Sequence, residues 1–208
     1  MSTLSSIFKS RIIAIIRGAK PDDVLKIAEA LCAGGIKLIE VTINSPKALE
    51  VIEELSGQMG NRALIGAGTV LDANTARAAI AAGAKFIISP STDLEIIKMT
   101  KRYDVVSIPG AFTPSEILAA HTHGGDIIKV FPARLGAEYI RDIRGPLPHI
   151  PLMPTGGVNL DNIREFQQAG AVAFGIGSSL VNTKHEITDE YLLELTDRAG
   201  KYVKEITV

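Results

Sequence analysis

Short apolar runs alternate with longer amphipathic segments along the whole chain. Eight apolar runs predict strands at 12–16, 38–43, 63–68, 86–89, 105–109, 127–131, 151–155 and 171–176. Between them, helical spacing brings apolar residues onto one face, as Val24, Ile27 and Leu31 show within 24–33. Strands that alternate with helices pair in parallel through crossover connections. The pattern therefore predicts an α/β protein with a parallel sheet.

Helix boundaries carry their own signals. Ser45-Pro46 and Thr113-Pro114 place a hydroxyl and then a proline at expected helix starts, and Glu116 completes a capping box with Thr113. Glycines stand where the helical patterns end, at 34–35, 83, 124–125 and 170, and these positions suit left-handed C-caps. Each repeat thus reads strand, loop, helix and glycine.

Eight strand–helix units favour a closed (β/α)8 TIM barrel. Successive strands start about 19 to 26 residues apart, which leaves room for one helix each. An open doubly wound sheet usually has a GxGxxG turn after its first strand, and residues 15–23, IIRGAKPDD, lack it. We expect residues 2–10 to form an extra helix closing the barrel bottom, 191–206 to form the last outer helix, and 1–208 to be one domain.

Charge and composition exclude several classes of partner. Lys plus Arg (22) and Asp plus Glu (23) nearly cancel to a net charge of -1, so neither nucleic acid nor a membrane surface is an expected partner. The apolar run 12–16 is too short for a signal peptide, which predicts a cytoplasmic protein. The single cysteine, Cys32, lies on an apolar helix face and is interpreted as structural.

Lys129 is the strongest chemical signal, because its neighbours from Ile127 to Phe131 are apolar and predict a buried strand. Desolvation lowers the pKa of a lysine, and a nearby cation such as Arg17 lowers it further. A neutral amine attacks ketones and forms Schiff bases. From this pattern alone, a lysine that extends outward between helices, or one ion-paired for structure, is an equal alternative.

Glu40 occupies a comparable place in the strand predicted at 38–43. A buried carboxylate needs a partner or a chemical task. An ion pair with Lys129 is one interpretation. The other is proton transfer during carbon–carbon bond cleavage beside an iminium, where several steps need an acid or a base.

Glycine-rich turns follow the last two predicted strands. PTGGV (154–158) and GIGSS (175–179) stand where many barrels bind phosphate through backbone amides, and Ser178 adds a hydroxyl. Plain tight turns are the alternative. In the turn 66–70, Thr69 is a candidate donor to a carboxylate. The histidines at 121, 123, 149 and 185 lack metal-ligand spacing, so neither a metal nor a cofactor is expected.

With these residues in place, the sequence resembles the 2-keto-3-deoxy-6-phosphogluconate aldolase family, also called 4-hydroxy-2-oxoglutarate aldolase. Members are class I, pyruvate-dependent aldolases. The resemblance implies cleavage of 2-keto-3-deoxy-6-phosphogluconate to pyruvate and glyceraldehyde 3-phosphate, with 4-hydroxy-2-oxoglutarate, which gives pyruvate and glyoxylate, as a further candidate substrate. The resemblance covers nearly the whole chain and rests on eight motifs together: IIRG (15–18), AGGIKLIEVT (33–42), LIGAGTV (64–70), FIISPS (86–91), IPGAFTPSE (108–116), IIKVFPA (127–133), PTGGV (154–158) and GIGSSL (175–180).

The resemblance implies a role for each matching residue. Lys129 is then the Schiff-base lysine, and Glu40 is the general acid and base. Arg17 and Thr69 would hold the substrate carboxylate. Pro90 and Phe131 would line the pocket, and the distal hydroxyls and phosphate would lie at Thr155, Gly156, Gly157 and Ser178. Members of the family are typically homotrimers, so a homotrimer is expected.

One position departs from the family pattern. Many members have an arginine four residues after the catalytic glutamate, and this chain has Asn44 there. Arg17 is the candidate replacement. The combination of IRG (16–18) with NSP (44–46) is similar to the family branch that cleaves the C4 epimer, 2-keto-3-deoxy-6-phosphogalactonate. Thr155, in contrast, resembles the gluconate branch, so the epimer stays open at this point.

Two other functions remain as alternatives. A sugar-phosphate epimerase shares the glycine turns but needs metal ligands or a two-sided acid/base pair, and the sequence shows neither set. A barrel that binds a phosphorylated keto acid without catalysis would not need both Glu40 and Lys129.

Overall fold

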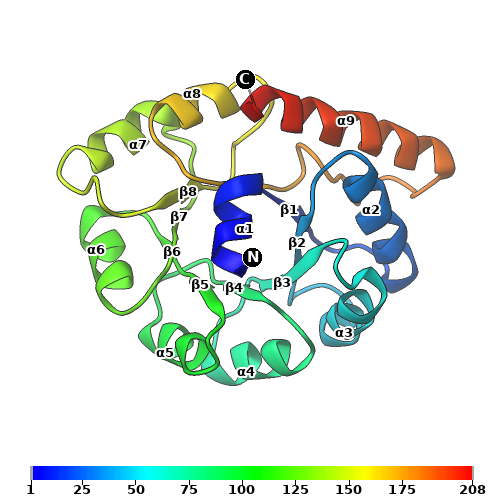
Figure 1. Cartoon of the computed structure of the whole chain (residues 1–208), viewed down its shortest axis with the longest axis horizontal. Helices are drawn as coiled ribbons and strands as arrows, with labels where there is room; N and C mark the ends of the chain where they lie inside the picture. The colour runs from blue at the N-terminus through cyan, green and yellow to red at the C-terminus, as the bar shows by residue number, and fades with distance from the viewer. Residues whose placement is uncertain (1, 208) are drawn as a thin grey trace.

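Parallel strands form a curled sheet surrounded by helices (Figure 1). The structure is a computed structural model that describes residues 2–207. The strands are β1 (Ile12–Ile16), β2 (Leu38–Thr42), β3 (Leu64–Gly68), β4 (Phe86–Ile88), β5 (Val106–Ile108), β6 (Gly110–Ala111), β7 (Ile128–Val130), β8 (Leu152–Pro154) and β9 (Phe174–Ile176). The helices are α1 (Thr3–Ser10), α2 (Pro21–Ala33), α3 (Ala48–Met59), α4 (Ala73–Ala81), α5 (Leu94–Arg102), α6 (Pro114–Thr122), α7 (Gly136–Arg144), α8 (Ile163–Gln168) and α9 (Asp189–Thr207). Among residues 2–207, none of the helices combines the length and the hydrophobicity that a membrane-spanning helix requires.

Backbone pairing arranges the strands in two groups that meet at both ends. Six strands pair in the order β5-β4-β3-β2-β1-β9, and three pair as β6-β7-β8. β5 and β6 follow each other across Pro109, whose carbonyl accepts the Lys129 N–H at 2.9 Å. On the other side, a bridge between Thr155 and Gly175 joins β8 to β9. The prediction of an α/β fold with a parallel sheet is therefore confirmed.

The predicted strands and helices lie close to the observed ones. Each of the eight apolar runs contains a strand, although the later strands are shorter than their runs, and the two-residue strand β6 was not predicted. The capping box of Thr113 and Glu116 is confirmed at the start of α6. Glycines at 35, 83, 124 and 170 have positive φ at helix ends, as predicted. The same prediction is wrong for Gly34, which has φ -79°, and for Gly125, which is not among the positive-φ residues.

The helix start predicted at Ser45-Pro46 is wrong. Helix α3 begins at Ala48, after Lys47 in a left-handed conformation (φ 51°) and without a side-chain cap. The Ser45 hydroxyl is engaged elsewhere, because its Oγ accepts the Gly18 N–H at 2.8 Å. A tertiary hydrogen bond thus takes the hydroxyl that the local pattern assigned to a cap.

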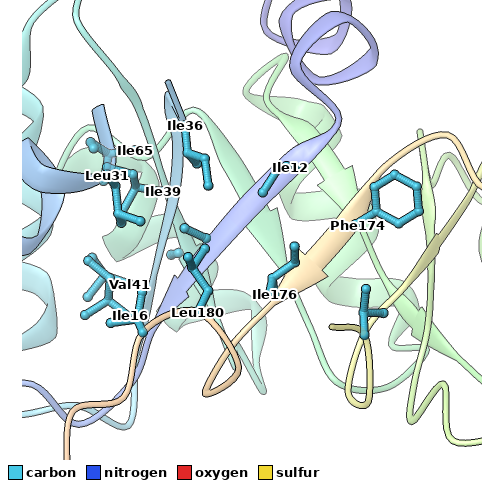
Figure 2. Close-up of a cluster of buried hydrophobic side chains, with 14 of the residues drawn as sticks. Ile12, Ile16, Leu31, Ile36, Ile39, Val41, Ile65, Phe174, Ile176 and Leu180 are labelled. Carbon is cyan, nitrogen blue, oxygen red and sulfur yellow. The ribbon is translucent and has the colours of Figure 1, made fainter. Parts of the chain in front are cut away.

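The larger of two buried apolar layers lies between the sheet and the helices. Figure 2 shows part of it, with Ile12 and Val41 from the strands and Leu31 from α2. In the register of β1 and β2, Ile16 pairs with Val41, and Ile12 lies on the same face of β1 as Ile16, so every second side chain of each strand faces the helices. Fully burying one such side chain stabilises the fold by about 1.5–3 kcal/mol, which makes this layer the main support of the sheet.

The smaller apolar layer contains strand residues whose side chains point away from the outer helices. Ile13, Leu38, Phe86, Ile127 and Met153 belong to it, and all are at most 1% exposed. Ile7 of α1 packs into the same cluster and is 0% exposed. In Figure 1, α1 lies over the centre of the ring of strands. Alternate strand residues therefore fill the interior of the curled sheet from the end where α1 lies.

Candidate active site

Glu40 and Lys129 point into the interior of the curled sheet. Each stands two residues after a member of the interior apolar cluster, Glu40 after Leu38 and Lys129 after Ile127, so it shares that residue's side of the strand. Glu40 is 0% exposed and Lys129 is 2% exposed. The structure therefore places both ionisable side chains inside the ring of strands, towards the carboxyl ends of β2 and β7.

The Glu40 carboxylate has no hydrogen-bond partner for either oxygen among the described residues. It packs against the backbone of Gly68 on β3, where a methyl group in place of the glycine hydrogen would overlap the carboxylate. A buried carboxylate without partners is costly unless it is protonated or meets a ligand. The site thus holds an acid group that the fold leaves available.

Burial shifts the pKa values of the two groups in opposite directions. Desolvation raises the pKa of Glu40, while the charges of Lys129 and Arg17 oppose this rise. Desolvation also lowers the pKa of Lys129, which Glu40 opposes and Arg17 reinforces. Both shifts favour the uncharged forms, a carboxylic acid and a free amine.

Phe131 adds a ring beside the amine. Lys129 Nζ lies 4.8 Å from the centroid of the Phe131 ring, at the carboxyl end of the same strand. The ring also lies close to the turn after β8, where a methyl group on Gly156 would lie 3.1 Å from a ring carbon. Phe131 is therefore a neighbour of both the amine and the first glycine of the turn 156–157.

A pocket of about 590 Å³ opens beside this pair at the carboxyl ends of the strands. Six of the predicted site residues line it: Arg17, Phe131, Thr155, Gly156, Gly157 and Ser178. Thr69 and Pro90 follow the ends of β3 and β4 and are not among its lining residues. Glu40 and Lys129 are buried outside the lining. The predicted residues thus lie at one edge of the sheet, and Thr69 and Pro90 are the substrate-binding candidates that do not line the pocket.

Two hydroxyl groups hold the turn that carries Arg17. The Thr183 hydroxyl, in the loop after β9, donates to the Arg17 carbonyl at 2.6 Å. The Gly18 N–H donates to Ser45 Oγ, and Ser45 Oγ lies 2.9 Å from the hydroxyl of Thr42 on β2. Loops after β2 and β9 therefore fix the backbone at Arg17.

Sequence reasoning missed several lining residues. Arg134, Asn159 and Lys184 line the pocket and were not predicted. Arg134 had a local signal, because it directly follows the motif KVFPA in the loop after β7. Thr183 had none, since its partner Arg17 lies 166 residues away in the chain. Across the described residues, no group of three or more His, Cys, Asp and Glu side chains is arranged to hold a metal ion.

Comparisons with known proteins agree with this geometry. A family model described as KDPG and KHG aldolase matches residues 4–194. A 2-dehydro-3-deoxy-phosphogluconate aldolase of Pseudomonas aeruginosa is 37% identical over 160 residues, which are 76% of this chain and 72% of the relative. A 2-dehydro-3-deoxy-6-phosphogalactonate aldolase of Escherichia coli is 33% identical, with 83% of this chain and 85% of the relative covered.

A solved structure adds a chemical observation on a similar protein. The KDPG aldolase of Legionella pneumophila matches with a TM-score of 0.87 and 31% identity, over 96% of this chain and 97% of that one. That structure contains pyruvate captured at low pH as a covalent carbinolamine intermediate. A carbinolamine is the adduct that an amine forms with a ketone before water leaves.

Proposed function

Because the chain belongs to the KDPG and KHG aldolase family, we propose that it is a class I aldolase that cleaves 2-keto-3-deoxy-6-phosphogluconate to pyruvate and glyceraldehyde 3-phosphate. The observation that carries the proposal is the buried pair inside the ring of strands, Lys129 at 2% and Glu40 at 0% exposure. The comparisons give the family of the chain. The pair of Lys129 and Glu40 supplies the nucleophile and the acid that the reaction needs.

In the proposed mechanism, the nitrogen lone pair of Lys129 attacks the C2 ketone and forms a carbinolamine. Glu40, whose pKa is raised by burial, acts as the acid in this step and donates a proton to the departing hydroxyl, and water leaves to give an iminium. The Glu40 carboxylate then accepts the proton of the C4 hydroxyl, and the C3–C4 bond breaks. Its electron pair moves to the iminium, giving an enamine and the free aldehyde. Protonation at C3 and hydrolysis release pyruvate and regenerate the amine.

The surrounding residues position the substrate in this proposal. Arg17 holds the C1 carboxylate and, as a nearby positive charge, helps keep Lys129 neutral. Thr69 is proposed as a second donor to that carboxylate, and Pro90 lines the approach to it. Phe131 and Thr155 flank the reacting carbons. Fixing both ends of the substrate aligns the scissile bond with the iminium π-system.

The distal phosphate is proposed to lie at the glycine turns. Gly156 and Gly157 have φ of 79° and 106°, a backbone conformation that residues other than glycine rarely adopt. Without a Cβ atom, the backbone of this turn can approach an anion closely. Ser178 in the loop after β9 contributes a hydroxyl. The preference between the gluconate and galactonate epimers stays a prediction, since relatives named for both substrates match the chain.

Three finer expectations belong to the same proposal. We propose that β5 and β6 act as one strand, so that the chain is a single closed (β/α)8 barrel with α1 closing the end opposite the pocket. A homotrimer, which light scattering coupled to size-exclusion chromatography tests, and a cytoplasmic location complete the expectation. The similarity to aldolases does not favour a barrel that binds without catalysis.

Incubation with pyruvate and borohydride tests the central step. Borohydride reduces an iminium to a stable secondary amine, so peptide mass mapping would find the pyruvate adduct on Lys129. Parallel assays with the two C4 epimers would measure both products, and we expect pyruvate and glyceraldehyde 3-phosphate to form in equal amounts. Ligand binding without pyruvate release, or an adduct on another lysine, would refute the proposed function.

A further inference from the structure

Positive charge is concentrated on the wall of the pocket. Arg17, Arg134 and Lys184 line it, and within the described part of the chain the lining contains no aspartate or glutamate. The nearby pair of Glu40 and Lys129 adds no net charge, whether both groups are ionised or both are neutral. A pocket of this kind favours ligands with several negative charges.

Two of these cations flank the glycine turns. Arg134 lies in the loop after β7, and its Cγ is 3.7 Å from the point that a Cβ on Gly157 would occupy. Its aliphatic stem therefore lies beside the turn after β8. Lys184 lies in the loop after β9, which also supplies Ser178 to the pocket. Since β7, β8 and β9 are neighbours, the two cations lie on either side of the turn at Gly156 and Gly157 in strand order.

Both cationic groups are free of protein partners. Among residues 2–207, no acidic side chain or carbonyl pairs with the Arg134 guanidinium or the Lys184 ammonium. Arg198, in contrast, donates to the Leu180 carbonyl and lies 3.8 Å from Glu194. Cations that stabilise the fold are usually paired in this way. The charges of Arg134 and Lys184 are thus available to a ligand.

We propose that Arg134 and Lys184 bind the substrate phosphate and make the enzyme select phosphorylated over unphosphorylated 2-keto acids. The inference rests on the proposed function, in which Arg17 takes the carboxylate at the other end. A phosphate carries about -1.5 to -2 charges at neutral pH, so the two cations match it. Backbone amides and the Ser178 hydroxyl can orient the terminal group of a substrate. The two positive charges add a preference for substrates that carry the phosphate over substrates that lack it.

Kinetics with two substrates test this role. We would measure kcat/KM for 2-keto-3-deoxy-6-phosphogluconate and for unphosphorylated 2-keto-3-deoxygluconate in Arg134→Gln and Lys184→Gln. Losing one charge-assisted hydrogen bond should lower the ratio of the two constants by about tenfold or more in each variant. Arg134→Lys should keep more of the preference than Arg134→Gln. Inorganic phosphate should inhibit wild-type cleavage competitively and inhibit both variants more weakly.

Arg141→Gln is the matched control, because Arg141 is exposed on α7 and does not line the pocket. An unchanged ratio in both Gln variants, or an equal loss in Arg141→Gln, would overturn the inference. Pyruvate trapping separates this failure from that of the proposed function. A wild-type adduct on Lys129 with an unchanged ratio refutes only the phosphate role, whereas no adduct refutes the aldolase itself.

Discussion

Along β2 and the segment that contains Lys129, two successive levels of the sheet interior differ in chemistry. At the level nearer α1, Leu38 of β2 and Ile127 are apolar and packed, with Ile7 sealing the cluster. Two residues further along, the same strands present Glu40 and Lys129. The first level is satisfied by packing alone, whereas the second contains a carboxylate without a hydrogen-bond partner among the described residues.

This difference shows how a fold tolerates a costly site. Burying an unpaired ionisable group opposes folding, while each buried apolar side chain contributes about 1.5–3 kcal/mol in favour of it. The apolar level and the layer under the helices fix the strand register, so the ionisable level cannot move away. Variants at the two levels should therefore separate activity from stability.

Lys129→Met should have the largest effect on activity. The variant lacks the nucleophile, so we expect kcat/KM to fall by about 10⁴-fold or more. Its free energy of unfolding should stay equal or rise, because an apolar side chain replaces a buried amine of similar length. Cleavage assays and denaturant titration measure the two quantities. A variant with a lower free energy of unfolding than wild type, or one that keeps its activity, would contradict the assignment of Lys129 to the ionisable level.

Glu40→Gln should come next. Removing a general acid and base should lower kcat by about 10²- to 10⁴-fold, with Lys129 still present. Pyruvate trapping should slow along with cleavage, because dehydration of the carbinolamine also needs the acid. Equal trapping rates in the variant and wild type would limit Glu40 to the later steps.

The same variant makes a prediction about pH. Burial raises the pKa of Glu40 above its ordinary value of 4.5, so the folded state binds a proton more tightly than the unfolded state. That contribution to stability is fully present below pH 4.5 and is lost as the pH rises through the folded-state pKa. Relative to Glu40→Gln, wild type should therefore lose free energy of unfolding across this range. Parallel curves from denaturant titrations would contradict the raised pKa.

Ile127→Ala tests the apolar level at the residue directly before β7, the strand that contains Lys129. We expect a loss of about 2–5 kcal/mol in free energy of unfolding, because the change leaves a cavity in a 0% exposed position. The value of kcat/KM below the melting transition should change only a few-fold. A large loss of activity in a stable variant would show that the two levels are coupled.

Thr183→Val should have the smallest effect. It removes the hydroxyl that donates to the Arg17 carbonyl, and one hydrogen bond is worth about 0.5–1.5 kcal/mol, or roughly two- to tenfold in affinity. KM should rise by that factor while kcat stays nearly constant, since Thr183 positions Arg17 without touching the reacting atoms. Thr183→Ser should restore KM. A change in kcat alone would contradict a positioning role.

The sequence was most informative where burial and local pattern agree. The run from Ile127 to Phe131 predicted a buried strand around a lysine, and the strand is there. It did not show which way Lys129 points, because both faces of an interior parallel strand are apolar. Ile127 and Ile128 look alike in the sequence, yet one lies inside the ring and the other under the helices. Only the pairing of neighbouring strands distinguishes them.

Long-range contacts explain what sequence reasoning missed. Ser45 carried a sound local signal for a helix cap, but its hydroxyl binds Gly18 from another loop. Lys184 is an exposed lysine in a polar loop, a pattern typical of any surface. Its place in the pocket wall follows from how the loop after β9 folds back, which no local spacing encodes.

The pH dependence of imine formation at Lys129 tests the account most directly. Wild-type protein would be incubated with pyruvate and cyanoborohydride over a pH series, and the rate of adduct formation at Lys129 measured by peptide mass spectrometry. Burial lowers the pKa of this amine, so the rate should reach its plateau below pH 10.5, the ordinary value for lysine. A rate that keeps rising up to that value, or an adduct spread over surface lysines, would contradict the account.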